Sequence, residues 1–169
     1  PKEEYFSRQS SDIFKSSWLM NNGQCVRKLE RSLSEYLGVR YILTGNNGTT
    51  ALMLALNVPD WLEEGAFTPY TYVATLSALL WLGCEPVFVD VEPNSFCLSS
   101  ELLWQRLRNE PDISGALPVH IYDLACDVES LEDICREHGV TLVYDAAQAF
   151  GSCYKGRSLL GYSICGFLA

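Results

Sequence analysis

Short, largely apolar stretches alternate with helix-like segments along this chain, and this alternation constrains the fold more than any other feature. The predicted strands are residues 39–44, 66–68, 86–91, 116–119 and 140–144. The predicted helices are residues 24–37, 49–56, 72–82, 99–108 and 130–138. Apolar strands connected by helices are typical of a parallel sheet covered on both faces. We therefore predict an α/β fold, a three-layer α/β/α sandwich with a mostly parallel central sheet.

Residues at the helix ends support these boundaries. Apolar residues recur at helical spacing over residues 24–37, and Gly38 suits the position just past the helix end. Ser130, with Asp133 three residues later, resembles a capping box. This pair predicts that the last helix starts at Ser130.

Charge and hydropathy exclude two kinds of partner. The 169 residues include 12 basic and 21 acidic ones, for a net charge of −9, and no cluster of Lys and Arg offsets this charge locally. Such a balance opposes binding to nucleic acid. No apolar run approaches the ~20 residues that span a bilayer, and the charged N-terminus is unlike a secretory signal. We expect neither nucleic acid nor a membrane as a partner.

The cysteines indicate the compartment. Seven are scattered along the chain, and no two of them form a Cys-x-x-Cys pair. Zinc sites need closely spaced ligand pairs, and disulfide frameworks belong to secreted chains. We therefore expect reduced thiols in a cytoplasmic protein, with no metal site.

The first candidate site residues are Gly48, Thr49 and Thr50, at the start of an apolar helix. Ligands of parallel sheets gather where strands end. Free backbone N–H groups and the helix dipole make a helix start an anion site, and two hydroxyl groups would add donors. The alternative is an ordinary helix cap after a flexible loop, which is much commoner.

Three further candidates follow later strands. Tyr72 could stack on a flat heterocycle, although a core tyrosine is at least as common. Asp145, if ionised beside a ring nitrogen, would keep that nitrogen protonated, and Gln148 could hydrogen-bond a ring oxygen. The alternative for Asp145 is a strand-end aspartate that caps the next turn. For His120, a structural role is the safer interpretation.

Several motifs occur in a fixed order along the chain. They are Ser17-Trp18-Leu19, NGTTAL (47–52), PYTYVAT (69–75), PVFVDV (86–91), PVHIY (118–122), DAAQA (145–149) and YKGR (154–157). Together they resemble the DegT/DnrJ/EryC1/StrS family of pyridoxal-phosphate (PLP) dependent sugar aminotransferases, of aminotransferase fold type I. Nearly the whole chain takes part in the resemblance, and ordered motifs are far more specific than any one of them.

The resemblance implies a PLP site. Its cofactor-binding residues would be Gly48, Thr49, Thr50, Tyr72, Asp145 and Gln148. Gly48 and Thr49 would bind the phosphate, and Tyr72 would stack on the ring. Asp145 would pair with the pyridine nitrogen, and Gln148 would contact the ring hydroxyl.

The resemblance also implies a reaction. The family transfers an amino group, typically from glutamate, to a nucleotide-linked keto-sugar. Such reactions serve the biosynthesis of cell-surface polysaccharides or of the sugars of secondary metabolites. The family's enzymes act as homodimers with active sites at the subunit interface, so we expect a homodimer.

Departures from the family pattern qualify these expectations. Residues 1–169 would be the N-terminal portion of an incomplete PLP-binding large domain, without the C-terminal small domain and with the Schiff-base lysine beyond Ala169. Lys155 belongs to a turn separate from that lysine, so we assign no catalytic residue and expect no transamination by this chain alone. Asp123 stands where the family often has glycine, and Gly166 replaces a serine that helps to hold the phosphate.

Two other functions stay open at the level of sequence. One is a non-catalytic remnant that binds a phosphate-bearing ligand or a partner. The other is a relative of the PLP-dependent sugar dehydratases, in which histidine replaces the lysine. The residue at the lysine position would distinguish transfer from dehydration.

Overall fold

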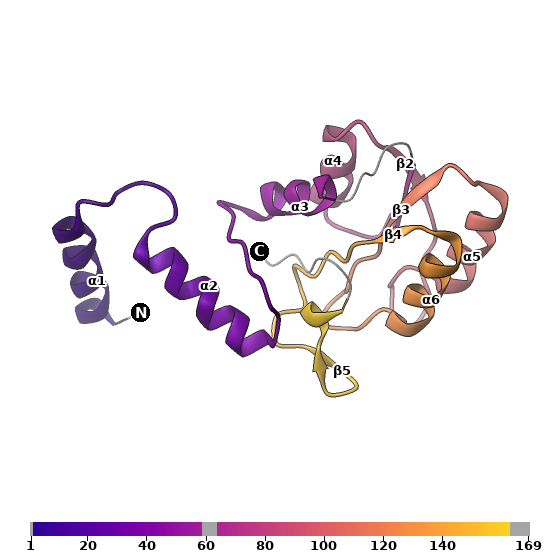
Figure 1. The fold of residues 1–169 in the computed structure, drawn as a ribbon. Helices are drawn as coiled ribbons and strands as arrows, with labels where there is room; N and C mark the ends of the chain where they lie inside the picture. The colour runs from indigo at the N-terminus through magenta and orange to yellow at the C-terminus, as the bar shows by residue number, and fades with distance from the viewer. Residues whose placement is uncertain (1, 59–63, 163–169) are drawn as a thin grey trace. The chain divides into compact units, whose positions relative to one another are not determined.

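The computed structural model describes residues 2–58 and 64–162. The chain divides into two compact units, Pro1–Thr44 and Gly45–Ala169, which are treated separately below (Figure 1). Gly166 and Ala169, singled out in the sequence, lie outside the described residues.

The first unit consists of two helices and a tail. Helix α1 spans Glu3–Ser16, and α2 spans Gln24–Leu37 as predicted, with Gly38 in the left-handed conformation at its end. The strand predicted at residues 39–44 is wrong, since the structure has no strand there. No other described strand lies in this unit to pair with the segment, and a lone strand is not stable. Thr44 instead donates its N–H and its hydroxyl to the Glu30 carboxylate, at 3.0 and 2.9 Å.

The second unit is built around a parallel sheet. Its strands are β1 (Glu64–Phe67), β2 (Glu85–Phe88), β3 (Ile113–Leu117) and β4 (Thr141–Leu142), in the order β2-β1-β3-β4. Every neighbouring pair is parallel, which confirms the predicted mostly parallel sheet. The last strand is shorter than predicted, but an isolated bridge between Val119 and Asp145 continues the pairing of these two segments.

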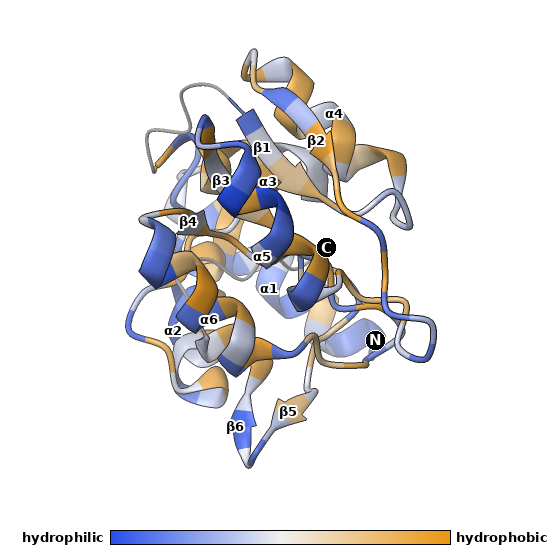
Figure 2. Ribbon diagram, turned by 90° about the vertical axis from the view of Figure 1, so that its right-hand side faces the viewer, coloured by the Kyte–Doolittle hydropathy of each residue, from blue (hydrophilic) through white to orange (hydrophobic). Residues whose placement is uncertain are grey.

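Four helices cover this sheet. They are α3 (Gly48–Asn57), α4 (Val73–Trp81), α5 (Ser100–Asn109) and α6 (Val128–His138). Helix α3 packs against α4, and α5 packs against α6. Figure 1 shows the two pairs on opposite faces of the sheet, as a three-layer fold requires. In Figure 2, α6 carries hydrophilic and hydrophobic stretches side by side, consistent with a helix that buries only one face.

The core on the α3–α4 side positions the loops that follow the strands. Leu52 and Leu56 from α3, Leu79 from α4, Phe67 from β1 and Leu117 from β3 are fully buried in one cluster. Ala51, in the first turn of α3, and Ala147, just after Asp145, pack against the same cluster. The start of α3 and the loop after β4 therefore border one core.

The start of α6 corrects a prediction. The helix begins at Val128 and its N-cap is Asp127, whose carboxylate accepts a hydrogen bond from the Ser130 N–H at 3.3 Å. The predicted capping box at Ser130 is wrong because Asp127 caps the helix three residues earlier, and Asp133 forms an ion pair with Arg136 instead.

The described chain ends in a small hairpin. Strands β5 (Cys153–Tyr154) and β6 (Arg157–Ser158) pair antiparallel, and a 3₁₀ turn, Leu159–Gly161, follows them. Of the helices in the described segments, none has the length and apolar character that crossing a bilayer would require.

Candidate functional site

Asp145 is a buried carboxyl group, 5% exposed, at the end of the β4 segment. One carboxylate oxygen accepts a hydrogen bond from the Thr75 hydroxyl at 2.8 Å, and the other accepts one from the Ala147 N–H at 3.1 Å. Burial raises the pKa of the Asp145 carboxyl, and these two hydrogen bonds offset part of the rise. Within residues 2–58 and 64–162, no basic side chain forms an ion pair with it. Asp145 is therefore fixed by neutral donors only.

Thr75 is a site residue that the sequence analysis did not single out. It lies in the first turn of α4, is fully buried, and joins the hydroxyl of Thr71 to Asp145, with 2.8 Å between the two hydroxyl oxygens. One sequence feature could have pointed to Thr75. It is a hydroxyl-bearing residue among the apolar residues of α4, three positions after Tyr72. Buried hydroxyl groups need partners, so such a residue predicts a polar contact from another element.

The first turn of α3 presents free donors. Asn47 is the N-cap, and its side-chain oxygen accepts from the Thr50 N–H at 2.9 Å. The N–H groups of Gly48 and Thr49 donate to no acceptor among the described residues. The predicted anion site thus has two unpaired donors at a helix start, where the dipole favours a negative group.

Tyr72 and Gln148 are both exposed. Tyr72 is the N-cap residue of α4 and is 74% exposed, which excludes the alternative of a core tyrosine. Gln148 lies three residues after Asp145, and its side-chain oxygen accepts from the Tyr122 N–H at 3.0 Å. Among the described residues, no hydrogen bond joins either side chain, or the first turn of α3, to the Asp145 carboxylate. The first turn of α3 and the loop after Asp145 border the same core through Ala51 and Ala147, while the Tyr72 and Gln148 side chains are exposed.

His120 is structural. It is fully buried, stacks on Tyr144 with 4.7 Å between ring centroids, and its Nδ1 accepts a hydrogen bond from the Cys126 N–H at 3.2 Å. Burial lowers the pKa of His120 to about 4, so the ring is neutral at physiological pH. Because Nδ1 is an acceptor, the proton is on Nε2. This agrees with the structural role that the sequence favoured.

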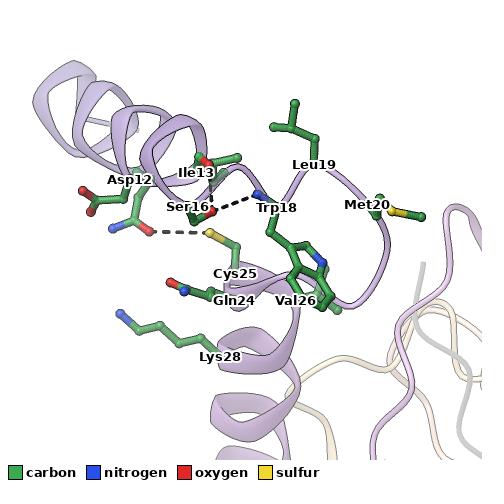
Figure 3. A pocket seen from close by; sticks show the side chains of 12 residues that line it. Asp12, Ile13, Ser16, Trp18, Leu19, Met20, Gln24, Cys25, Val26 and Lys28 are labelled. Atoms are coloured by element: carbon green, nitrogen blue, oxygen red, sulfur yellow. Dashed lines mark hydrogen bonds between the residues drawn. The ribbon is translucent and has the colours of Figure 1, made fainter.

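The first unit contains a separate cavity. Its volume is about 420 Å³, and its lining includes Asp12, Trp18, Cys25 and Lys28. Figure 3 shows these side chains around it, with the Cys25 thiol hydrogen-bonded to the Gln9 side chain at 3.6 Å. None of the predicted PLP-binding residues lines this cavity. Within the described part of the chain, no group of acidic, His or Cys side chains is arranged to hold a metal ion.

Comparison with known proteins identifies the family. The model of the DegT/DnrJ/EryC1/StrS aminotransferase family matches residues 2–167. The chain belongs to this family. The resemblance found in the sequence is thereby confirmed over nearly the whole chain.

Curated relatives of the family act on nucleotide sugars. The chain is 40% identical over 156 residues to the dTDP-4-amino-4,6-dideoxy-D-glucose transaminase of Escherichia coli, covering 92% of this chain and 42% of that protein. It is 32% identical over 151 residues to the GDP-perosamine synthase of Vibrio cholerae, covering 88% of this chain and 41% of that protein. The chain therefore spans about two fifths of the length of these relatives.

Solved structures agree on the fold. DesI, crystallised with its TDP-sugar product, matches with a TM-score of 0.90 at 28% identity, over 96% of this chain and 41% of that one. A putative sugar aminotransferase, Spr1654 from Streptococcus pneumoniae in its PLP form, matches with a TM-score of 0.85 at 26% identity, over 96% of this chain and 45% of that one. The α/β fold with its parallel sheet is thus that of PLP-dependent aminotransferases.

Proposed function

We propose that this chain carries the cofactor-binding part of a PLP-dependent aminotransferase that acts on a nucleotide-linked keto-sugar, with an amino donor such as glutamate. The observation that carries the proposal is Asp145, a buried carboxyl group whose described partners are all neutral. A buried carboxylate is costly without a positive partner. The protonated ring nitrogen of PLP would supply that charge. The dTDP-, GDP- and TDP-linked sugars named for the relatives support the substrate class.

On this proposal the candidate residues have separate tasks, and Gln148 contacts the ring hydroxyl. Gly48 and Thr49 bind the cofactor phosphate through the free N–H groups of the helix start, with the Thr50 hydroxyl as a further donor. The exposed ring of Tyr72 stacks on the pyridine ring, and Asp145 keeps the proton on the ring nitrogen. PLP, when bound, supplies the electron sink that makes the substrate's C–H proton removable.

The lysine that carries the cofactor lies, on this proposal, outside the 169 residues. We expect that Lys155 is not a substitute, because it lies in the turn of the β5–β6 hairpin and its ammonium group pairs with the Glu129 carboxylate of α6 at 2.6 Å. Borohydride reduction of the protein with PLP, followed by peptide mapping, should therefore find no pyridoxyl group on Lys155. A stoichiometric adduct there would contradict this part of the proposal.

We further expect a large-domain fragment of a cytoplasmic homodimer. The described cysteines are all free thiols, as is typical of cytosolic proteins. The first unit leaves apolar side chains exposed, Phe6 and Phe14 in α1 and Leu19 and Met20 in the connection between α1 and α2, which favours contact with a second copy. Light scattering coupled to size exclusion tests this expectation, and a monomer at all concentrations would contradict it.

The decisive experiment measures PLP affinity by equilibrium dialysis for the wild-type protein and for Asp145→Asn. Asparagine keeps the size and the hydrogen bond from Ala147 but removes the charge. Losing a charge-assisted contact weakens binding by about 10- to 100-fold. Asp112→Asn is the matched control, because Asp112 is exposed in a turn of the same unit. Equal affinity of wild type and Asp145→Asn would refute the proposed role.

A further inference from the structure

The turn at residues 121–124 has an unusual backbone. Tyr122 and Asp123 both have positive φ angles, 49° and 63°, and the Leu124 N–H donates to the Ile121 carbonyl at 2.8 Å. Turns with two successive left-handed residues normally use glycine or asparagine. Aspartate tolerates this conformation better than most residues, and tyrosine does not. Strain of this kind persists only where the surroundings hold it in place.

Three contacts hold the turn. The Ser152 hydroxyl donates to the Asp123 carboxylate at 3.1 Å, and the hydroxyl oxygens of Tyr70 and Tyr122 lie 3.1 Å apart. The third contact is the hydrogen bond from the Tyr122 N–H to Gln148. Each contact reaches a different segment: the loop after β1, the loop after β4, and the approach to β5. The turn is therefore held by contacts with three other segments, one of which carries the candidate residue Gln148.

The contact with Gln148 fixes which end of its amide faces outward. A backbone N–H can only donate, so the amide oxygen of Gln148 must face Tyr122. The amide NH₂ group is then left as a donor, and it has no acceptor among the described residues. The ligand atom that fits it is an acceptor, and on the proposed function that atom is the ring oxygen of PLP.

We infer that the 121–124 turn is a positioning device for Gln148, and that Asp123 acts as a positioning residue through its hydrogen bond with Ser152. The inference rests on the proposed function for the identity of the ligand. Among the described residues, Asp123 forms no hydrogen bond with Gln148 and accepts one from Ser152 instead. It holds the left-handed turn that presents the Tyr122 N–H, and this N–H orients the amide.

A double-mutant cycle on PLP affinity tests the inference. Asp123→Ala should weaken PLP binding by about 3- to 10-fold, since a mispositioned amide loses one hydrogen bond to the ligand. In a Gln148→Ala background the same substitution should change PLP affinity by less than about 2-fold, because the amide through which Asp123 acts on the ligand is absent. Asp123→Asn keeps an acceptor for Ser152 and tolerates the left-handed turn, so it should bind like wild type.

The outcomes separate the two claims. Equal PLP affinity of wild type and Asp123→Ala, or the same loss in both backgrounds, overturns the inference and leaves the proposed function standing. Absence of PLP binding by the wild-type protein overturns the proposed function and the inference with it. Ser152→Ala removes the same hydrogen bond from the other side, and it carries the test if Asp123→Ala does not fold. Asp112→Ala, on the exposed turn before β3, should leave the affinity unchanged.

Discussion

Replacing Thr75 with valine removes the hydroxyl group that lies between Thr71 and the buried Asp145 carboxylate. Valine has nearly the same shape, so no cavity forms and the effect isolates the hydrogen bond. The wild-type bond to the carboxylate is 2.8 Å long and fully buried. Hydrogen bonds to charged groups contribute about 1.5–3 kcal/mol, so Thr75→Val should lower the free energy of unfolding by about 2 kcal/mol when Asp145 is ionised.

The pH dependence of this loss of stability follows from whether each effect raises or lowers the pKa of the Asp145 carboxyl. Burial raises the pKa of the carboxyl, and the Thr75 hydrogen bond lowers it, so removing the hydroxyl raises the pKa further. The folded variant then holds its proton to higher pH than the folded wild type does. The extra instability is largest where Asp145 is ionised in both folded proteins. It shrinks as the pH falls below the raised pKa of the folded wild-type carboxyl, where both folded proteins hold the proton.

Urea unfolding followed by circular dichroism, repeated between pH 4 and pH 8 without PLP, measures this difference. Thr75→Ser is the control, because serine keeps the hydroxyl and loses only a buried methyl group. That loss costs about 1 kcal/mol at every pH. If Thr75→Val lost the same stability at all pH values, the proposed coupling between Thr75 and the charge on Asp145 would be refuted.

Three further predictions concern the stability of the elements that surround the candidate site. Leu52→Ala should lower the free energy of unfolding by about 2–5 kcal/mol, whereas Leu54→Ala on the exposed side of the same helix should cost less than half as much; urea titration compares them. Asp127→Ala should cost about 1 kcal/mol by removing the cap of α6, and Ser130→Ala should cost nothing measurable by thermal melting. The lowered pKa of His120, about 4 against 6.5, means that the unfolded chain binds a proton first, so stability falls as the pH drops from about 6.5 to about 4. His120→Gln should flatten that part of the stability profile, and an unchanged slope would contradict the assignment.

The sequence predicted a helix well where the helical spacing of its apolar residues and the residue type at its end gave the same boundary. Helix α2 begins and ends as its apolar spacing and Gly38 indicate. The error at Ser130 arose because serine and aspartate are both common N-cap residues, and only the structure shows that Asp127 is the one that accepts the hydrogen bond. The strand predicted at residues 39–44 failed for another reason: β structure depends on a partner strand, which a local pattern does not contain.

The amino-acid sequence was enough to predict the alternation of strands and helices, the parallel sheet, and the positions of Gly48, Asp145 and Gln148 at segment ends. These follow from periodicity and from turn residues, which act within a few positions along the chain. Two contacts could be found only in the folded chain: the Thr75 hydroxyl hydrogen-bonds Asp145 across 70 residues, and the Tyr122 N–H donates to the side-chain oxygen of Gln148. Such contacts join side chains from separate elements, and their geometry depends on how helices and strands pack, which no local pattern records.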